Sequence, residues 1–160
     1  MDSWYGFFQS AAGGSATLIG MVVVAISINL SRILSIAHLP DRAASALVPL
    51  AGVLVVSTLA FVPGQPRAVF GAEVLVTGAA IWIMTGLMLL RSLPKAAGMP
   101  RGWLWSHLLL GQAQSLPFAI AGVMSILGAP SALYWLVPGV VFAILGGILN
   151  TWVLLIEILR

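Results

Sequence analysis

Five apolar stretches dominate this sequence, and their length constrains the fold more than any other feature. They cover approximately residues 7–30, 43–62, 68–90, 104–127 and 132–157. An α-helix needs ~20 mostly apolar residues to cross the hydrocarbon core of a bilayer. None of the stretches alternates between polar and apolar residues as the strands of a membrane β-barrel do. The sequence therefore predicts an all-α integral membrane protein, a bundle of about five transmembrane helices in a single domain over residues 1–160.

The composition of the chain argues against a separate soluble domain. Of 160 residues, 61% are hydrophobic and only 7% are charged, whereas about a quarter of the residues of a soluble domain carry a charge. The five stretches and their turns use nearly the whole length. The first residues lack the basic segment of a signal peptide, so we expect the first stretch to be retained as one span of a multi-pass membrane protein.

Basic residues fall almost entirely on one side of the predicted bundle. Six of the seven are expected there: Arg32, Arg42, Arg91, Lys95, Arg101 and Arg160. Only Arg67 is expected on the other side. Because basic loops remain in the cytoplasm, the carboxyl terminus is predicted to be cytoplasmic and the amino terminus outside, in the inner membrane of a cell. Aromatic residues at both predicted interfaces, including Trp4 and Tyr134 outside and Trp103 inside, favour the same orientation.

The positive charge of the chain points to lipid rather than to nucleic acid. The formal net charge is +3, but the basic residues lie at the ends of the stretches and form no continuous stripe of the kind that binds nucleic acid. The expected partner is anionic lipid at the cytoplasmic face, where each Lys or Arg contributes about 1 kcal/mol of attraction.

Small and polar residues form one face of the fifth stretch. At helical spacing this face holds Gly139, Ala143, Gly146, Asn150 and Glu157. Small residues allow another helix to approach closely, and Asn150 is able to form a hydrogen bond across the contact. Two interpretations remain open. The face is either a packing seam whose Glu157 reaches headgroups or pairs with Arg160, or a wet pathway or oligomer axis lined by Asn150 and Glu157.

The first stretch carries a similar face, with Gly13 and Gly20 as expected helix-packing positions. Asn29 and Arg32 lie on a different face, close to the predicted cytoplasmic end and at the same depth as Glu157. Together with Asn150, these three residues form either a gate or ion site, or a buried structural clamp.

Two further stretches contain polar candidates. In the third, Glu73 lies one to two turns from the outer end, where it either attracts cations or extends to water beside Arg67. In the fourth, Gln112 and Gln114 precede Pro117. Glutamines beside a proline mark either a broken helix that lines a cavity or an ordinary pair of interhelical hydrogen-bonding residues.

The sequence lacks the residues that most catalytic and metal sites require. It contains no cysteine and only two histidines, His38 and His107. None of the common hydrolase, nucleotide-binding or zinc-protease motifs occurs. We therefore expect no enzymatic activity, no metal and no cofactor.

Two functions remain in view. The first is a small oligomeric membrane channel or transporter, with cations as the expected species, that self-associates through the small-residue faces of the first or fifth stretch. The alternative is a non-enzymatic accessory or regulatory subunit of a larger membrane complex, whose polar seams contact other membrane proteins.

Overall fold

The computed structural model describes the backbone of residues 2–36, 39–92 and 101–159, and the side-chain environments of residues 3–36, 39–91 and 113–156. Within these ranges the chain is helical and contains no β-strand. Two short 3-10 turns, η1 (Asp2–Trp4) and η3 (Ala132–Trp135), accompany the six α-helices. The α-helices are α1 (Tyr5–Ile28), α2 (Leu30–Ser35), α3 (Leu39–Leu59), α4 (Arg67–Ser92), α5 (Arg101–Ile126) and α6 (Leu136–Leu159). The predicted all-α class is confirmed.

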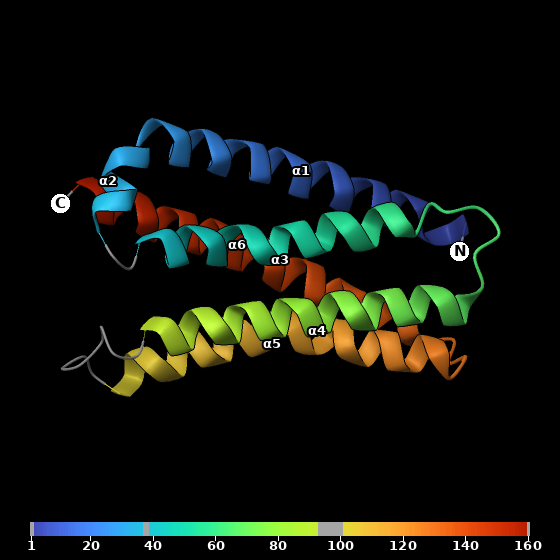
Figure 1. Ribbon diagram of the computed structural model, residues 1–160. Helices are drawn as coiled ribbons and strands as arrows, with labels where there is room; N and C mark the ends of the chain where they lie inside the picture. The colour runs from blue at the N-terminus through green and yellow to red at the C-terminus, as the bar shows by residue number, and fades with distance from the viewer. Residues whose placement is uncertain (1, 37–38, 93–100, 160) are drawn as a thin grey trace.

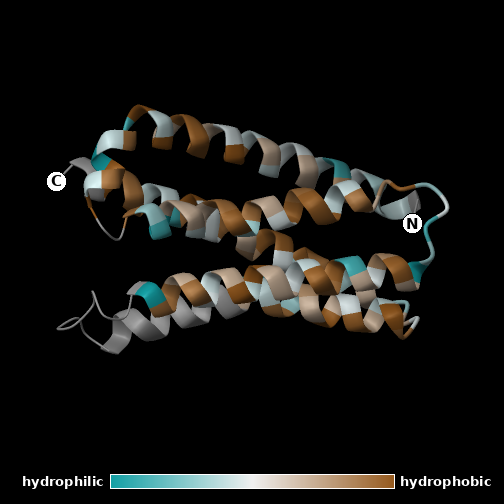
Figure 2. Cartoon of the chain, viewed as in Figure 1, coloured by the Kyte–Doolittle hydropathy of each residue, from teal (hydrophilic) through white to brown (hydrophobic). Residues whose placement is uncertain are grey.

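Four helices are long and apolar enough to cross a membrane. These segments are Tyr5–Ile28, Leu39–Leu59, Arg67–Arg91 and Ala132–Ile156, and the described part of α5 adds a shorter apolar helix, Ala113–Ile126. Figure 2 shows apolar residues along the coloured parts of the helices, with most of the strongly hydrophilic ones near the helix ends. The helices are thus those of a multi-pass membrane bundle. The fifth crossing stays a prediction, because side chains are described only for the second half of α5.

The bundle consists of two helix pairs and a crossing helix. In Figure 1, α1 lies beside α3, α4 lies beside α5, and α6 runs diagonally behind both pairs. The amino terminus, the α3–α4 turn and the α5–α6 turn lie at one end of the bundle, while α2 and the carboxyl terminus lie at the other. We call these the amino-terminal end and the carboxyl-terminal end. Because α6 contacts α3 as well as α5, it joins the two pairs.

The first apolar stretch divides into two helices at Asn29. The Nδ2 group of Asn29 donates to the carbonyl oxygen of Ala25 at 2.9 Å, and its backbone N–H donates to Ile26 O at 3.2 Å. Asparagine favours helix ends because its side chain competes for backbone partners. The short helix α2 then turns toward α6, where Ile33 and Leu154 belong to one small buried cluster. The predicted continuous span therefore ends slightly earlier than expected.

Glycines bring α4 and α5 into backbone contact. A Cβ atom on Gly122 of α5 would lie 2.7 Å from the backbone nitrogen of Leu75 and 2.8 Å from the carbonyl oxygen of Gly71, both in α4. No side chain larger than hydrogen fits at that distance. Close approach of this kind lets two helices pack tightly in a membrane, where dispersion contacts replace the hydrophobic effect.

Candidate functional site at the centre of the bundle

A buried amide side chain lies at the middle of the bundle. Gln114 of α5 is only 3% exposed. Its amide packs directly on Gly146 of α6, in the space that a Cβ atom of residue 146 would occupy. Both residues lie close to the midpoints of their helices. Burial of an amide without partners costs several kcal/mol, so this position requires hydrogen-bonding groups around it.

Two prolines leave backbone carbonyls near the middle of α3 and α5 without their usual helical donor. Pro117 lies three residues after Gln114 and has no N–H to donate to the carbonyl of Ala113. Pro49, at the middle of α3, likewise cannot donate to the carbonyl of Ser45. Each of these two helices therefore has one carbonyl near its middle that lacks its usual intrahelical donor.

The glycine pair of α6 connects the two proline-containing helices. Gly146 faces Gln114, and a Cβ atom on Gly147 would lie 2.9 Å from the Cδ1 atom of Leu50, the neighbour of Pro49. Asn150 is half-buried one turn beyond Gly146 on the same face. We define Gln114, Gly146, Asn150 and the two prolines as the central polar site.

The predicted small-residue face of the fifth stretch packs within the chain. A Cβ atom on Gly139 would lie 3.0 Å from Cε2 of Phe118 in α5, and Ala143 is completely buried. Together with Gly146 these residues form the seam between α6 and α5. Three of the predicted residues thus serve packing inside one copy, and the same face brings Asn150 toward the central polar site.

Aromatic side chains close the bundle at its amino-terminal end. The ring centroids of Phe8 and Phe70 are 6.0 Å apart, and both residues are almost completely buried. The ring of Trp4 packs edge-on against Phe7 and Tyr134, with centroid distances of 5.6 and 4.9 Å. We call these five residues the aromatic cap.

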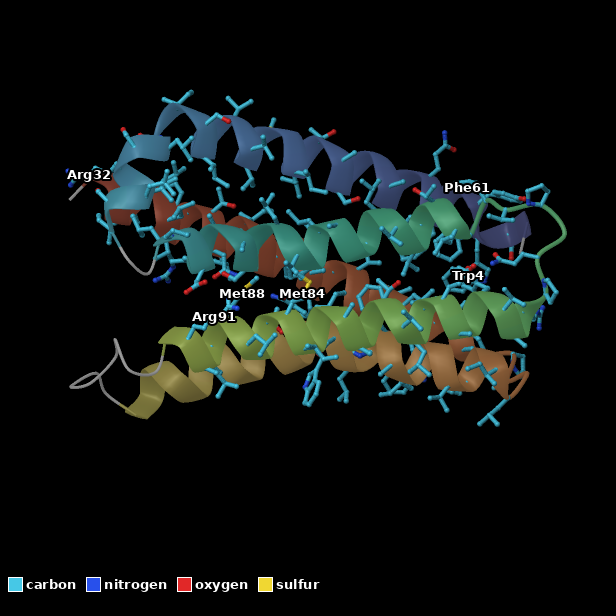
Figure 3. The ribbon with its side chains drawn as sticks, viewed as in Figure 1. Trp4, Arg32, Phe61, Met84, Met88 and Arg91 are labelled. Atoms are coloured by element: carbon cyan, nitrogen blue, oxygen red, sulfur yellow. The ribbon has the colours of Figure 1, made fainter. Side chains whose placement is uncertain are left out.

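The side chains of α4 toward α3 are buried at mid-helix and more exposed toward the carboxyl-terminal end. Ile81 of α4 contacts Gly52 of α3 and is 2% exposed. Further along α4, Met84 is 46% exposed and Arg91 is also exposed. Figure 3 shows Met84, Met88 and Arg91 on the side of α4 that faces α3. Met84 and Arg91 are therefore less covered by the described part of the chain than Ile81 is.

Glu73 lies outside the central polar site. It is half-buried near the start of α4, and its Oε2 atom accepts a hydrogen bond from Nε2 of Gln65 at 2.6 Å. In the described part of the chain no salt bridge joins it to Arg67. The structure thus ties Glu73 to the α3–α4 turn.

Asn29 and Arg32 lie at the carboxyl-terminal end of the bundle. Asn29 bonds to its own helix, and Arg32 is exposed beside the end of α6 (Figure 3). The cluster of Ile33 with Leu154 shows that α2 and α6 meet there. The predicted contacts of Glu157 with these residues, and the role of Gln112, lie outside the residues whose side chains are described.

Gly13 and Gly20 face away from the rest of the chain. A Cβ atom on either residue would meet nothing within 4 Å. The neighbouring hydroxyls of Thr17 and Ser27 donate to Gly13 O and Val23 O of the same helix, both at 2.8 Å. This face of α1 is therefore free of intrachain packing, and its hydroxyls are satisfied locally.

Sequence reasoning missed the contribution of Pro49. A proline in the middle of an apolar stretch is itself a visible signal, but only the contact of Leu50 with Gly147 shows that this part of α3 packs on α6 next to Gly146. Among the described residues there is no group of three His, Asp or Glu side chains that would hold a metal ion. No protein-family model, curated protein or solved structure matches this chain.

Proposed function

We propose that this chain is a small membrane transporter whose substrate binds at the central polar site. The observation that carries the proposal is Gln114, a buried amide at mid-bundle, packed on Gly146 and one turn from a helix-interrupting proline. Transporters bind substrates near the bilayer midplane, in helices interrupted by Gly or Pro. A polar group that served only to dock a foreign helix would lie on an outer face.

The proposed topology has five crossings, with the amino terminus outside and the carboxyl terminus in the cytoplasm of a cell membrane. The basic residues support this orientation. In that orientation the aromatic cap closes the outer side, and the exposed Met84 lies in the inner half of the bundle. We propose that substrate reaches the central polar site from the cytoplasmic side, with Pro49 and Pro117 as hinges between two states.

Cations are the proposed substrate class. Gln114 and Asn150 each offer an amide oxygen, and the carbonyls of Ala113 and Ser45 lack their helical N–H donors. Rings of neutral carbonyl oxygens replace the hydration shell of monovalent cations in membrane filters. Carboxylates near the two ends, Glu73 and Glu157, would raise the local cation concentration without placing a charge at the bilayer centre, which costs at least ~3 kcal/mol.

The test is cation flux into proteoliposomes that contain the full chain. Gln114→Leu removes the amide and is expected to lower flux at least tenfold. Gln9→Leu is the matched control, because Gln9 is exposed on α1, and it is expected to retain wild-type flux. Asn150→Leu should reduce flux as well, and Glu73→Gln and Glu157→Gln should lower the apparent affinity for the cation.

Loss of flux is interpretable only if the variants fold. Thermal stability and a monodisperse size-exclusion profile are therefore measured for each protein. Wild-type flux that is indifferent to Gln114→Leu and Asn150→Leu contradicts the central site. No cation flux in the wild type at all contradicts the transporter.

Self-association is proposed to use the outer face of α1. Because Gly139, Ala143 and Gly146 are occupied by intrachain packing, Gly13 and Gly20 remain as the small-residue positions open to a second helix. This free face also favours the second candidate function, an accessory or regulatory subunit that docks to another membrane protein. A wild type that shows neither flux nor self-association supports that alternative.

A further inference from the structure

A pocket of about 110 Å³ lies at the amino-terminal end of the bundle. It forms where η1, the start of α4, the end of α5 and η3 meet. Its walls include Ser3, Trp4, Arg67, Phe70, Ser125 and Leu133. Phe70 and Ser125 are buried, whereas Ser3 and Arg67 are exposed. The pocket is thus separate from the central polar site.

The hydroxyl of Ser125 lacks a partner inside the pocket. Most serine and threonine hydroxyls on these helices donate to a carbonyl three or four residues earlier, as Thr77 does to Glu73 O at 2.8 Å and Thr151 does to Gly147 O at 2.7 Å. Ser125 is only 6% exposed, yet its hydroxyl forms no hydrogen bond with the described part of the chain. Its oxygen is not one of the fully enclosed unpaired atoms of the described residues, so it opens into the pocket and is available to donate to a ligand there.

The polar groups of the pocket are suited to an anion. Arg67 supplies a fixed positive charge and several donors, and the hydroxyls of Ser3 and Ser125 add two more. Neither Ser3 nor Arg67 bonds to another described residue, and none of the lining residues whose side chains the structure describes is an Asp or Glu. Guanidinium groups bind phosphate oxygens through paired hydrogen bonds.

The size of the pocket limits the ligand to a small group. A volume of about 110 Å³ accommodates a few water molecules, at ~30 Å³ each in the liquid, or one phosphate group. It lies below the ~300 Å³ of the smallest pockets that enclose a complete drug-sized ligand. The rest of a larger ligand would therefore remain outside, in the surrounding lipid or solvent.

We propose that this pocket binds the phosphate group of an anionic phospholipid from the membrane leaflet at the amino-terminal end. Arg67 contacts the phosphate at the rim and Ser125 donates from the base. Trp4 is an aromatic residue of the type that lies at headgroup level, and Leu133 adds an apolar wall. Free inorganic phosphate has the same oxygen chemistry, so the experiment must separate the two sources.

The experiment measures retention of phosphatidylglycerol by the full-length protein in detergent, using native mass spectrometry. The wild type is expected to retain one lipid molecule at low lipid concentration. Arg67→Gln should weaken retention at least tenfold, and Ser125→Ala several-fold. Arg32→Gln is the matched control, since Arg32 is an exposed arginine at the opposite end of the bundle, and it should leave this lipid bound.

Competition identifies the source of the phosphate. Retention that millimolar inorganic phosphate does not displace, together with weaker retention of phosphatidylcholine, supports a lipid site. Displacement by inorganic phosphate that depends on Arg67 overturns the lipid and assigns a free anion to the same pocket. Retention that is equal in wild type, Arg67→Gln and Arg32→Gln overturns the site itself. None of these measurements depends on cation flux, so they test the lipid site independently of the transporter proposal.

Discussion

Gly146→Ala probes the contact between α6 and Gln114 with a single methyl group. The new Cβ atom would occupy the space of the Gln114 amide. Overpacking a tight core costs about 1–3 kcal/mol, and displacing the buried amide from its partners adds about 1–3 kcal/mol. The higher helix propensity of alanine offsets up to ~1 kcal/mol of this loss of stability. The net expectation is a loss of about 1–6 kcal/mol, which lowers the melting temperature by roughly 2–24 °C in a chain of this size.

The assay is thermal unfolding in detergent, with two comparison proteins. Gly86→Ala is the control, because a Cβ atom there meets nothing within 4 Å, and its stability should be equal to or slightly above that of the wild type. The double variant Gly146→Ala with Gln114→Ala removes the clashing amide. It should be more stable than the sum of the single effects predicts, with a coupling energy of about 0.5–3 kcal/mol. A Gly146→Ala protein as stable as Gly86→Ala would refute the proposed contact.

Three further predictions follow from the packing and the charges. Gly122→Ala should destabilise the protein by about 3 kcal/mol or more, because the Cβ atom of the new alanine meets the backbone of α4 rather than a movable side chain. An unchanged thermal unfolding temperature would argue against the close approach of α4 and α5. Gly20→Leu should weaken self-association in native detergent measurements without lowering the melting temperature, whereas a wild type that is already monomeric removes the proposed α1 contact. A reporter fused after Arg160 should be active only in the cytoplasm, and activity in the periplasm would contradict the five-span orientation.

The apolar stretches could be located from the sequence because length and hydropathy decide which helices suit a membrane. The bounds of α3 and α4 differ from the predicted stretches by only a few residues. The break at Asn29 was missed, because the apolar run continues on both sides of it and only the local hydrogen bonds to Ala25 and Ile26 end the helix.

The roles of the small-residue faces could not be separated by sequence. Gly13 and Gly20 repeat at the same helical spacing as Gly139 and Gly146, yet the first pair faces outward and the second is covered by α5. Helical period predicts which residues share a face but not which neighbour covers it. The sequence shows that Gln114 is polar and lies close to Pro117. It does not show which helix covers Gln114, so the contact with Gly146 is known only from the structure.

The most direct test of the central claim is the reaction of single cysteines with a membrane-impermeant thiol reagent. The natural chain contains no cysteine, so Asn150→Cys and Trp152→Cys each carry one thiol. Trp152 is 65% exposed on the outside of α6, whereas Asn150 is half-buried beside the central polar site. Because the reactive thiolate forms in water rather than in lipid, a wet transport site predicts that Asn150→Cys reacts from the cytoplasmic side and Trp152→Cys does not. An unreactive Asn150→Cys, in a variant that still folds, would contradict a transport site at the centre of this bundle.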